Sequence, residues 1–109
     1  MAYDEKLAAR VRKVLARRRG IAEIKMMGGL CFTLYGNMCC GVVNNDLVVR
    51  VGPERYEGAL ARPHARPMDF TGRPLKGFVY VGPGGYTVDK ALQDWVQQGL
   101  KFALSLPAK

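Results

Sequence analysis

The middle of the chain, from residue 24 to residue 51, constrains the fold most strongly, because several apolar segments there are separated by very short turns. The segments are residues 24–26, Leu30–Tyr35, Met38–Val43 and Leu47–Val51, joined by Gly28-Gly29, Gly36-Asn37 and Asn44-Asn45-Asp46. Gly36-Asn37 is typical of a two-residue hairpin turn. Parallel strands need crossovers of a dozen or more residues, so connections this short predict an antiparallel sheet.

Helical periodicity flanks this region on both sides. Residues 4–19 carry an apolar stripe at helical spacing, with Asp4 as N-cap and Gly20 as the left-handed residue that ends the helix. Near the other end, Thr87 is the predicted cap of a long final helix. That helix has one broad apolar face, formed by Val88, Leu92, Trp95, Val96, Phe102, Ala103 and Leu106.

The segment between these regions predicts shorter elements. Pro53–Leu60 is expected to form a short helix, Arg62–Pro74 an irregular loop with room for one short strand, and Lys76–Val81 a further strand. The element order predicts an α+β fold of two layers, with an antiparallel sheet of about five strands packed against the N-terminal and C-terminal helices. We expect residues 1–109 to form a single domain, because 109 residues match a common domain size.

Charge is the unusual feature of the composition. The chain has 17 Lys and Arg against 9 Asp and Glu, a formal net charge of +8, of which +5 lies in the first 25 residues. This balance permits binding to nucleic acid, to an anionic membrane surface or to an acidic protein partner, and does not choose among them. The apolar runs are too short to span a bilayer, the start is charged rather than signal-like, and three cysteines suit a reducing compartment, so we expect a cytoplasmic protein without membrane contact.

A basic row on the first predicted helix is the leading candidate site. The candidate residues for binding nucleic acid or another anion are Lys6, Arg10, Lys13 and Arg17, extended by Arg18 and Arg19. A structural role is the alternative, because acidic residues near a helix start and basic residues near its end favour the helix dipole. The helix also lacks aromatic residues on which bases could stack.

The arginine-rich loop that follows the short helix offers a second candidate. Arg66 and Arg73 can bind an anion there, or they can hold the loop in shape by bonding backbone carbonyls or Asp69. A small enzyme that combines these arginines with Asp69 and His64 is a further hypothesis. Ser105 does not lie on a turn that would expose a nucleophile, so a Ser-His-Asp triad is not expected.

The three cysteines lie on the predicted hairpin. With Gly36-Asn37 as the turn, Thr33 lies opposite Cys40, which places Cys31 and Cys40 on one face and Cys39 on the other. Their spacing does not match a zinc site, and His64 is the only histidine, so neither a metal nor a cofactor is expected. We interpret the cysteines as small buried apolar residues.

Several stretches together resemble a known family. Lys25-Met26-Met27-Gly28-Gly29 is similar to the Lys-Met-Phe-Gly-Gly opening of the TfoX/Sxy N-terminal domain, with Met27 in place of phenylalanine. Further stretches that match in order and spacing are Leu30-Cys31-Phe32, Met38-Cys39-Cys40-Gly41-Val42, Asp46–Gly52, Ala65–Pro74 and Leu92–Pro107. The resemblance implies a two-layer α/β arrangement like that of secretion chaperones, and it supplies no catalytic residue. Full-length members regulate natural competence and carry a second, C-terminal domain, which we do not expect in this chain.

The resemblance, the concentrated basic charge and the absence of a catalytic motif together predict a non-enzymatic protein that acts by binding a macromolecule, in a transcription-related role. The expected partner is another protein or a second copy of the chain, as a homodimer. Direct binding to the phosphate backbone of nucleic acid and a small enzyme or anion-binding protein that uses the arginine-rich loop remain as alternatives.

Overall fold

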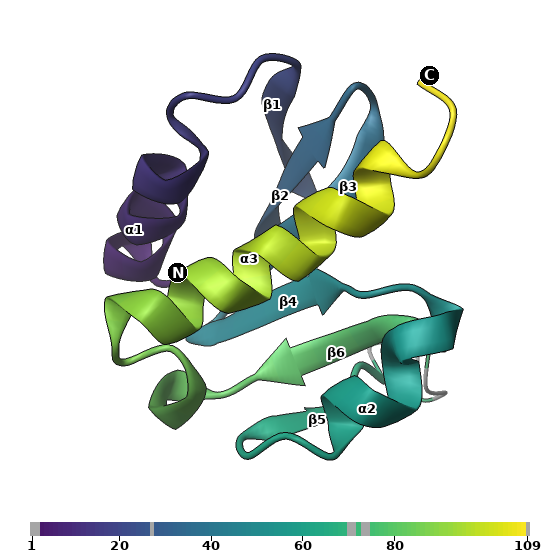
Figure 1. The fold of residues 1–109 in the computed structure, drawn as a ribbon. Helices are drawn as coiled ribbons and strands as arrows, with labels where there is room; N and C mark the ends of the chain where they lie inside the picture. Colours follow the sequence, from purple (N-terminus) through teal and green to yellow (C-terminus); the bar gives the residue numbers. More distant parts are fainter. Residues whose placement is uncertain (1–2, 27, 70–71, 73–74, 109) are drawn as a thin grey trace.

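The chain folds into one six-stranded sheet with its helices packed against it (Figure 1). This computed structural model describes residues 3–26, 28–69, 72 and 75–108. The elements in chain order are α1 (Glu5–Leu15), β1 (Ile21–Met26), β2 (Gly29–Leu34), β3 (Asn37–Val43), β4 (Asp46–Arg50), η1 (Pro53–Arg55), α2 (Tyr56–Leu60), β5 (Ala65–Pro67), β6 (Phe78–Val81), η2 (Pro83–Gly85) and α3 (Asp89–Leu104).

The sheet confirms the predicted α+β class and antiparallel pairing. Its strand order is β1-β2-β3-β4-β6-β5, and every neighbouring pair is antiparallel. The first four strands follow one another as hairpins, as their short connections require. The sheet has six strands rather than about five, because Ala65–Pro67, inside the predicted irregular loop, pairs with β6.

The β2–β3 turn lies one residue earlier than the sequence predicts. Its central residues are Tyr35 and Gly36, with φ of +50° and +86°, and Leu34 pairs with Asn37. Positive φ at both positions gives the turn twist that suits a hairpin. Asn37 instead belongs to β3, where its side-chain amide donates a hydrogen bond of 2.9 Å to the carbonyl of Pro107.

The start of α1 confirms the predicted cap, but its end does not match the prediction. The Asp4 side chain accepts hydrogen bonds from the backbone N–H groups of Lys6 and Leu7, at 2.9 and 3.2 Å. The helix ends at Leu15, so Gly20 is not its C-terminal residue. Gly20, with φ of +82°, precedes β1, and its carbonyl accepts the Tyr35 N–H at 2.8 Å.

The predicted cap of α3 is wrong by one residue. Val88 occupies the N-cap position and makes no side-chain capping bond. The hydroxyl of Thr87 donates to the carbonyl of Pro83 at 2.8 Å, which ties it to the preceding η2 turn. Asp89 provides the acidic group of the first helical turn, where the helix dipole favours a negative charge.

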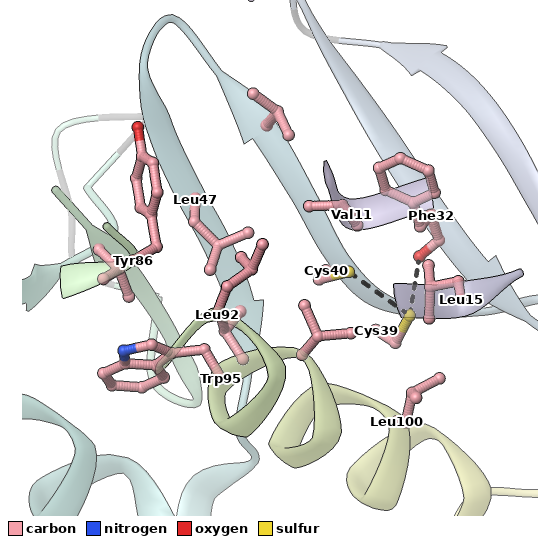
Figure 2. Packing of buried hydrophobic residues seen from close by; sticks show 14 of the residues in the cluster. Val11, Leu15, Phe32, Cys39, Cys40, Leu47, Tyr86, Leu92, Trp95 and Leu100 are labelled. Carbon is pink, nitrogen blue, oxygen red and sulfur yellow. Dashed lines mark hydrogen bonds between the residues drawn. The ribbon is translucent and has the colours of Figure 1, made fainter. Parts of the chain in front are cut away.

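The main core lies between one face of the sheet, called here the helix face, and the helices (Figures 1 and 2). All three α-helices of the described residues contribute buried side chains to it, including Val11 of α1, Ala59 of α2 and Trp95 of α3. Strand side chains alternate between the faces, so Phe32 and Val49 point into this core. The helices therefore form one layer and the sheet the other.

The opposite face of the sheet, called here the outer face, has a smaller apolar cluster. Val48, Met68 and Tyr80 are buried there, and the partly buried residues packed against them are Met38, Val43 and Phe78. In the part of the chain that the structure describes, this face carries no helix.

Candidate functional site

Arg10, one of the predicted site residues, connects α1 to the start of α3. Its guanidinium donates to the Asp89 carboxylate at 3.0 Å and to the carbonyl of Thr87 at 3.2 Å. It also lies 5.8 Å from the centre of the Tyr86 ring. Because this side chain already has an anionic partner, its main role in the fold is to join two segments 79 residues apart.

Arg12, which the sequence analysis did not single out, makes a two-pronged ion pair with Glu23 of β1. Both hydrogen bonds measure 2.9 Å. The bond to Arg12 lowers the pKa of Glu23, and the same bond raises the pKa of Arg12. Sequence spacing gives no signal for this pair, because the helix must dock beside β1 before the two groups meet.

The remaining cations of the predicted row are exposed and form no ion pair within the described part of the chain. We call these residues the α1 cations: Lys6, Lys13, Arg17, Arg18 and Arg19. Because α1 ends at Leu15, the three arginines lie in the connection to β1 and not on a continuous helical row. This corrects the predicted arrangement, and the charge is spread over a helix face and the turn beyond it.

Arg66 has a structural partner in the sheet. Its guanidinium donates two hydrogen bonds to Asp46, at 3.2 and 2.6 Å, and lies 4.9 Å from the centre of the Tyr80 ring. These contacts connect β5 to β4 across β6, and the bond to Asp46 raises the pKa of Arg66. The carboxylate partner is thus Asp46, whereas the sequence suggested Asp69. The other predicted residue of this loop, Arg73, lies outside the described residues.

The residues of the enzyme hypothesis are not joined by any hydrogen bond among the described positions. His64 is exposed, has φ of +68°, and accepts the Gly82 N–H at its carbonyl, at 2.9 Å. Its ring packs against Gly84, where a Cβ atom would collide with the imidazole. The histidine therefore supports the β6–η2 turn rather than facing Arg66 or Asp69.

The cysteines are placed differently from the prediction. Phe32 pairs with Cys40 and Thr33 with Met38, so Cys39 is the extra residue of a bulge, and both adjacent cysteines point into the helix-face core (Figure 2). The Cys39 thiol donates to the carbonyl of Phe32 at 3.4 Å and lies 3.8 Å from the Cys40 sulfur. Cys31 is on the outer face, opposite Gly41.

Burial governs the chemistry of these thiols. Cys39 and Cys40 are both 0% exposed. Their mutual hydrogen bond lowers the pKa of Cys39 and, together with burial, raises that of Cys40. Burial raises the pKa of Cys31 to about 11. Reagents in water therefore do not reach the one thiol with a lowered pKa while the chain is folded.

Among the described residues, no cluster of three or more His, Cys, Asp or Glu side chains could hold a metal ion. None of the helices formed by the described residues combines the length and the apolar character needed to cross a membrane.

Comparison with protein families gives a match that covers most of the chain. The family model described as the TfoX N-terminal domain matches residues 13–103 of the 109. The chain belongs to this family. Neither the curated proteins nor the solved structures contain a match.

The TfoX N-terminal domain match divides the candidate site. It spans every strand of the sheet, and it includes Lys13, Arg17, Arg18, Arg19 and Arg66. Lys6 and Arg10 lie before it, in the first turns of α1. The cations beside β1 are thus within the part of the chain that matches the TfoX N-terminal domain.

Proposed function

We propose that this TfoX N-terminal domain is a non-enzymatic module that binds an acidic macromolecule in the cytoplasm, in a regulatory role related to transcription. The observation that carries the proposal is the difference between two groups of cations. Arg10, Arg12 and Arg66 are each paired with a carboxylate. The α1 cations, by contrast, are exposed and have no such partner among the described residues.

Unpaired surface cations favour recognition over stability. An exposed ion pair contributes about 0–1 kcal/mol to folding, so pairing the α1 cations internally would add little. Left unpaired, they attract an acidic partner and raise its association rate. The partner that we favour is a protein with an acidic surface, because α1 carries no aromatic residue on which bases could stack.

The non-enzymatic assignment is supported by how the candidate catalytic groups are used. Arg66 is bonded to Asp46, and the exposed ring of His64 lies against Gly84 of the η2 turn. Catalytic acids and bases act in concert within hydrogen-bonding reach, and among the described residues no hydrogen bond joins Arg66, His64 and Asp69.

Direct binding to nucleic acid is the second candidate, favoured by the run Arg17-Arg18-Arg19 in an exposed connection. Side chains of this kind contact phosphates without reading bases. If all five α1 cations do so, log K should fall against log salt with a slope of about −4 to −5.

The test compares the unaltered chain with two triple charge reversals. One variant changes three of the five α1 cations (Lys13→Glu, Arg17→Glu, Arg18→Glu), and the control makes the same charge change elsewhere (Arg55→Glu, Lys76→Glu, Lys101→Glu). Labelled DNA and RNA are titrated at several salt concentrations, and partners are captured from lysate by cross-linking. Loss of a protein partner in the first variant only supports the favoured candidate. Salt-dependent nucleic-acid binding lost in the same variant supports the second.

A result in which both variants bind alike rejects the α1 cations as the contact surface. Absence of DNA and RNA binding at low salt rejects the second candidate.

A further inference from the structure

The two edges of the sheet are protected to very different degrees. β5, at one edge, has three residues, ends in Pro67, and carries Arg66 bonded to Asp46. β1, at the other, has six residues and no proline. Proteins usually protect edge strands by shortness, proline or charge, because an open edge pairs readily with another strand. β1 is neither short nor interrupted by proline, so only charge protects it.

The backbone of β1 presents unpaired groups along this edge. The Tyr35 N–H donates to the Gly20 carbonyl at 2.8 Å, which makes Gly20–Tyr35 a hydrogen-bonded pair of the antiparallel ladder. Bonded and non-bonded pairs alternate in such a ladder. The N–H and C=O groups of Ile21, Glu23 and Lys25 therefore point away from β2, toward whatever lies beyond the edge.

We propose that β1 pairs antiparallel with β1 of a second copy of this chain, around a twofold axis at Ile24, so that one sheet continues through both copies. In this register Glu23 lies opposite the partner's Lys25, and Lys25 opposite the partner's Glu23. Both residues have outward-pointing backbone groups, so each of these pairs exchanges two backbone hydrogen bonds. Each also brings opposite charges together on the helix face.

Charge selects this register from the alternatives. An antiparallel partner must place outward-pointing residues opposite one another. An axis at Glu23 would set two glutamates opposite each other, and an axis at Lys25 would set two lysines opposite each other, both of which are unfavourable. An axis at Ala22 leaves Lys25 opposite the partner's Arg19. The register centred on Ile24 is the one in which both charged positions meet an opposite charge.

Two side chains of β1 already have the exposure or the position that this contact needs. Ile24 is 47% exposed on the outer face, and pairing places it directly against Ile24 of the partner subunit, which removes apolar surface from water. The Glu23 carboxylate is held by Arg12 at 2.9 Å, so it occupies a defined position before a partner arrives. Ordering the charged group in advance lowers the entropic cost of association.

The test is a charge-exchange experiment followed by analytical ultracentrifugation from about 1 μM to about 1 mM. We expect the unaltered chain to dimerise in this range. Glu23→Lys and Lys25→Glu should each be monomeric, because each sets like charges opposite one another twice. Mixed in equal amounts, the two variants should form a one-to-one heterodimer, since every charged position then meets its opposite.

Two further variants separate this edge from general effects. Lys25→Glu lowers the net positive charge, so weaker association of this variant cannot arise from overall repulsion. Lys25→Pro removes an outward N–H while leaving the bonds between β1 and β2 intact, and it should give a folded monomer by circular dichroism. Lys101→Glu, the matched control, should dimerise as the unaltered chain does.

A monomeric unaltered chain at the highest concentration would overturn the proposal. So would dimers that persist in both single charge variants, or a mixture of these variants that stays monomeric while both remain folded.

Discussion

The two faces of the sheet are buried by different means. The helix face is closed by α-helices, and its core includes Trp95, Phe32 and the bulged Cys39. On the outer face, a smaller cluster around Val48 and Tyr80 is closed by a methionine that follows β5, Met68. The side chains between helices and sheet are closely packed and cannot easily rearrange, whereas a methionine side chain is flexible and adapts to irregular gaps. The helix face should therefore tolerate change poorly, and the outer face better.

The largest effect is expected at Trp95, which is 1% exposed in α3 and has the Arg62 guanidinium 3.9 Å from its ring centre. Trp95→Ala should lower the free energy of unfolding by about 3–5 kcal/mol, because it leaves a large cavity in a rigid core. Urea unfolding followed by circular dichroism measures the change. Gln93→Ala, on the exposed side of the same helix, should change it by less than about 0.5 kcal/mol. Equal losses at both positions would contradict the contrast between buried and exposed sides.

A smaller change in the free energy of unfolding is predicted at Gly99, where replacing glycine by alanine should destabilise the protein although it usually stabilises a helix. Alanine normally stabilises a helix by about 1 kcal/mol relative to glycine. At Gly99, however, the added Cβ would collide with the backbone carbonyl of Cys39, so α3 must move away from β3. Gly99→Ala should therefore cost about 2–3 kcal/mol.

The matched control is Gly58→Ala in α2, where no atom lies within 4 Å of the added Cβ. This variant should gain up to about 1 kcal/mol. Thermal and urea unfolding of both variants give the comparison, and stabilisation by Gly99→Ala would show that the helix face adapts after all.

On the outer face, Met68→Ala should cost about 2 kcal/mol, the lower end of the range for buried methionine. Met68 is 6% exposed, and the flexible side chain of Met38 packs against the same cluster and can fill part of the space. Urea unfolding tests this value. A loss as large as that of Trp95→Ala would mean that the two faces are equally rigid.

The last effect appears only at high pH and is absent near neutrality. Burial raises the pKa of Cys31, on the outer face, to about 11 from an ordinary value of 9.0. A folded-state pKa above the unfolded one means that the contribution of Cys31 to stability is complete below about pH 9 and is lost as pH rises through about 11. The free energy of unfolding should fall across this window.

Cys31→Ala should reduce that fall without abolishing it. Burial also raises the pKa values of Tyr80 and Tyr86, so their share of the decline remains in the variant. Urea unfolding at a series of pH values distinguishes the outcomes, and an unchanged slope in Cys31→Ala would exclude Cys31 as a contributor.

Local patterns predicted much of this fold. Short connections indicated antiparallel hairpins, and Asp4 was identified as a cap, because both depend on neighbours in sequence. The position of the β2–β3 turn was missed by one residue, since Asn37 is recruited into β3 and bonded to Pro107, a distant segment. The bulge at Cys39 is a separate register shift near that turn, and side-chain alternation alone could not anticipate it.

The candidate site was predicted only in part for the same reason. The sequence located the basic charge in the first 25 residues, but it treated Arg10 and Lys13 as equivalent. The structure separates them, because Arg10 meets Asp89 after α1 packs beside α3, whereas Lys13 has no ion-pair partner among the described residues.

The sequence by itself determined the antiparallel sheet, the flanking helices and the amount of basic charge, since these depend on residue type and short-range spacing. Tertiary structure alone decided which cations are neutralised, that β5 joins the sheet, and that β1 is left with an open edge. Arg10 and Asp89 lie 79 residues apart, and Arg66 and Asp46 lie 20 apart. Such pairs form only when packed elements bring distant groups within hydrogen-bonding distance, which no local pattern encodes.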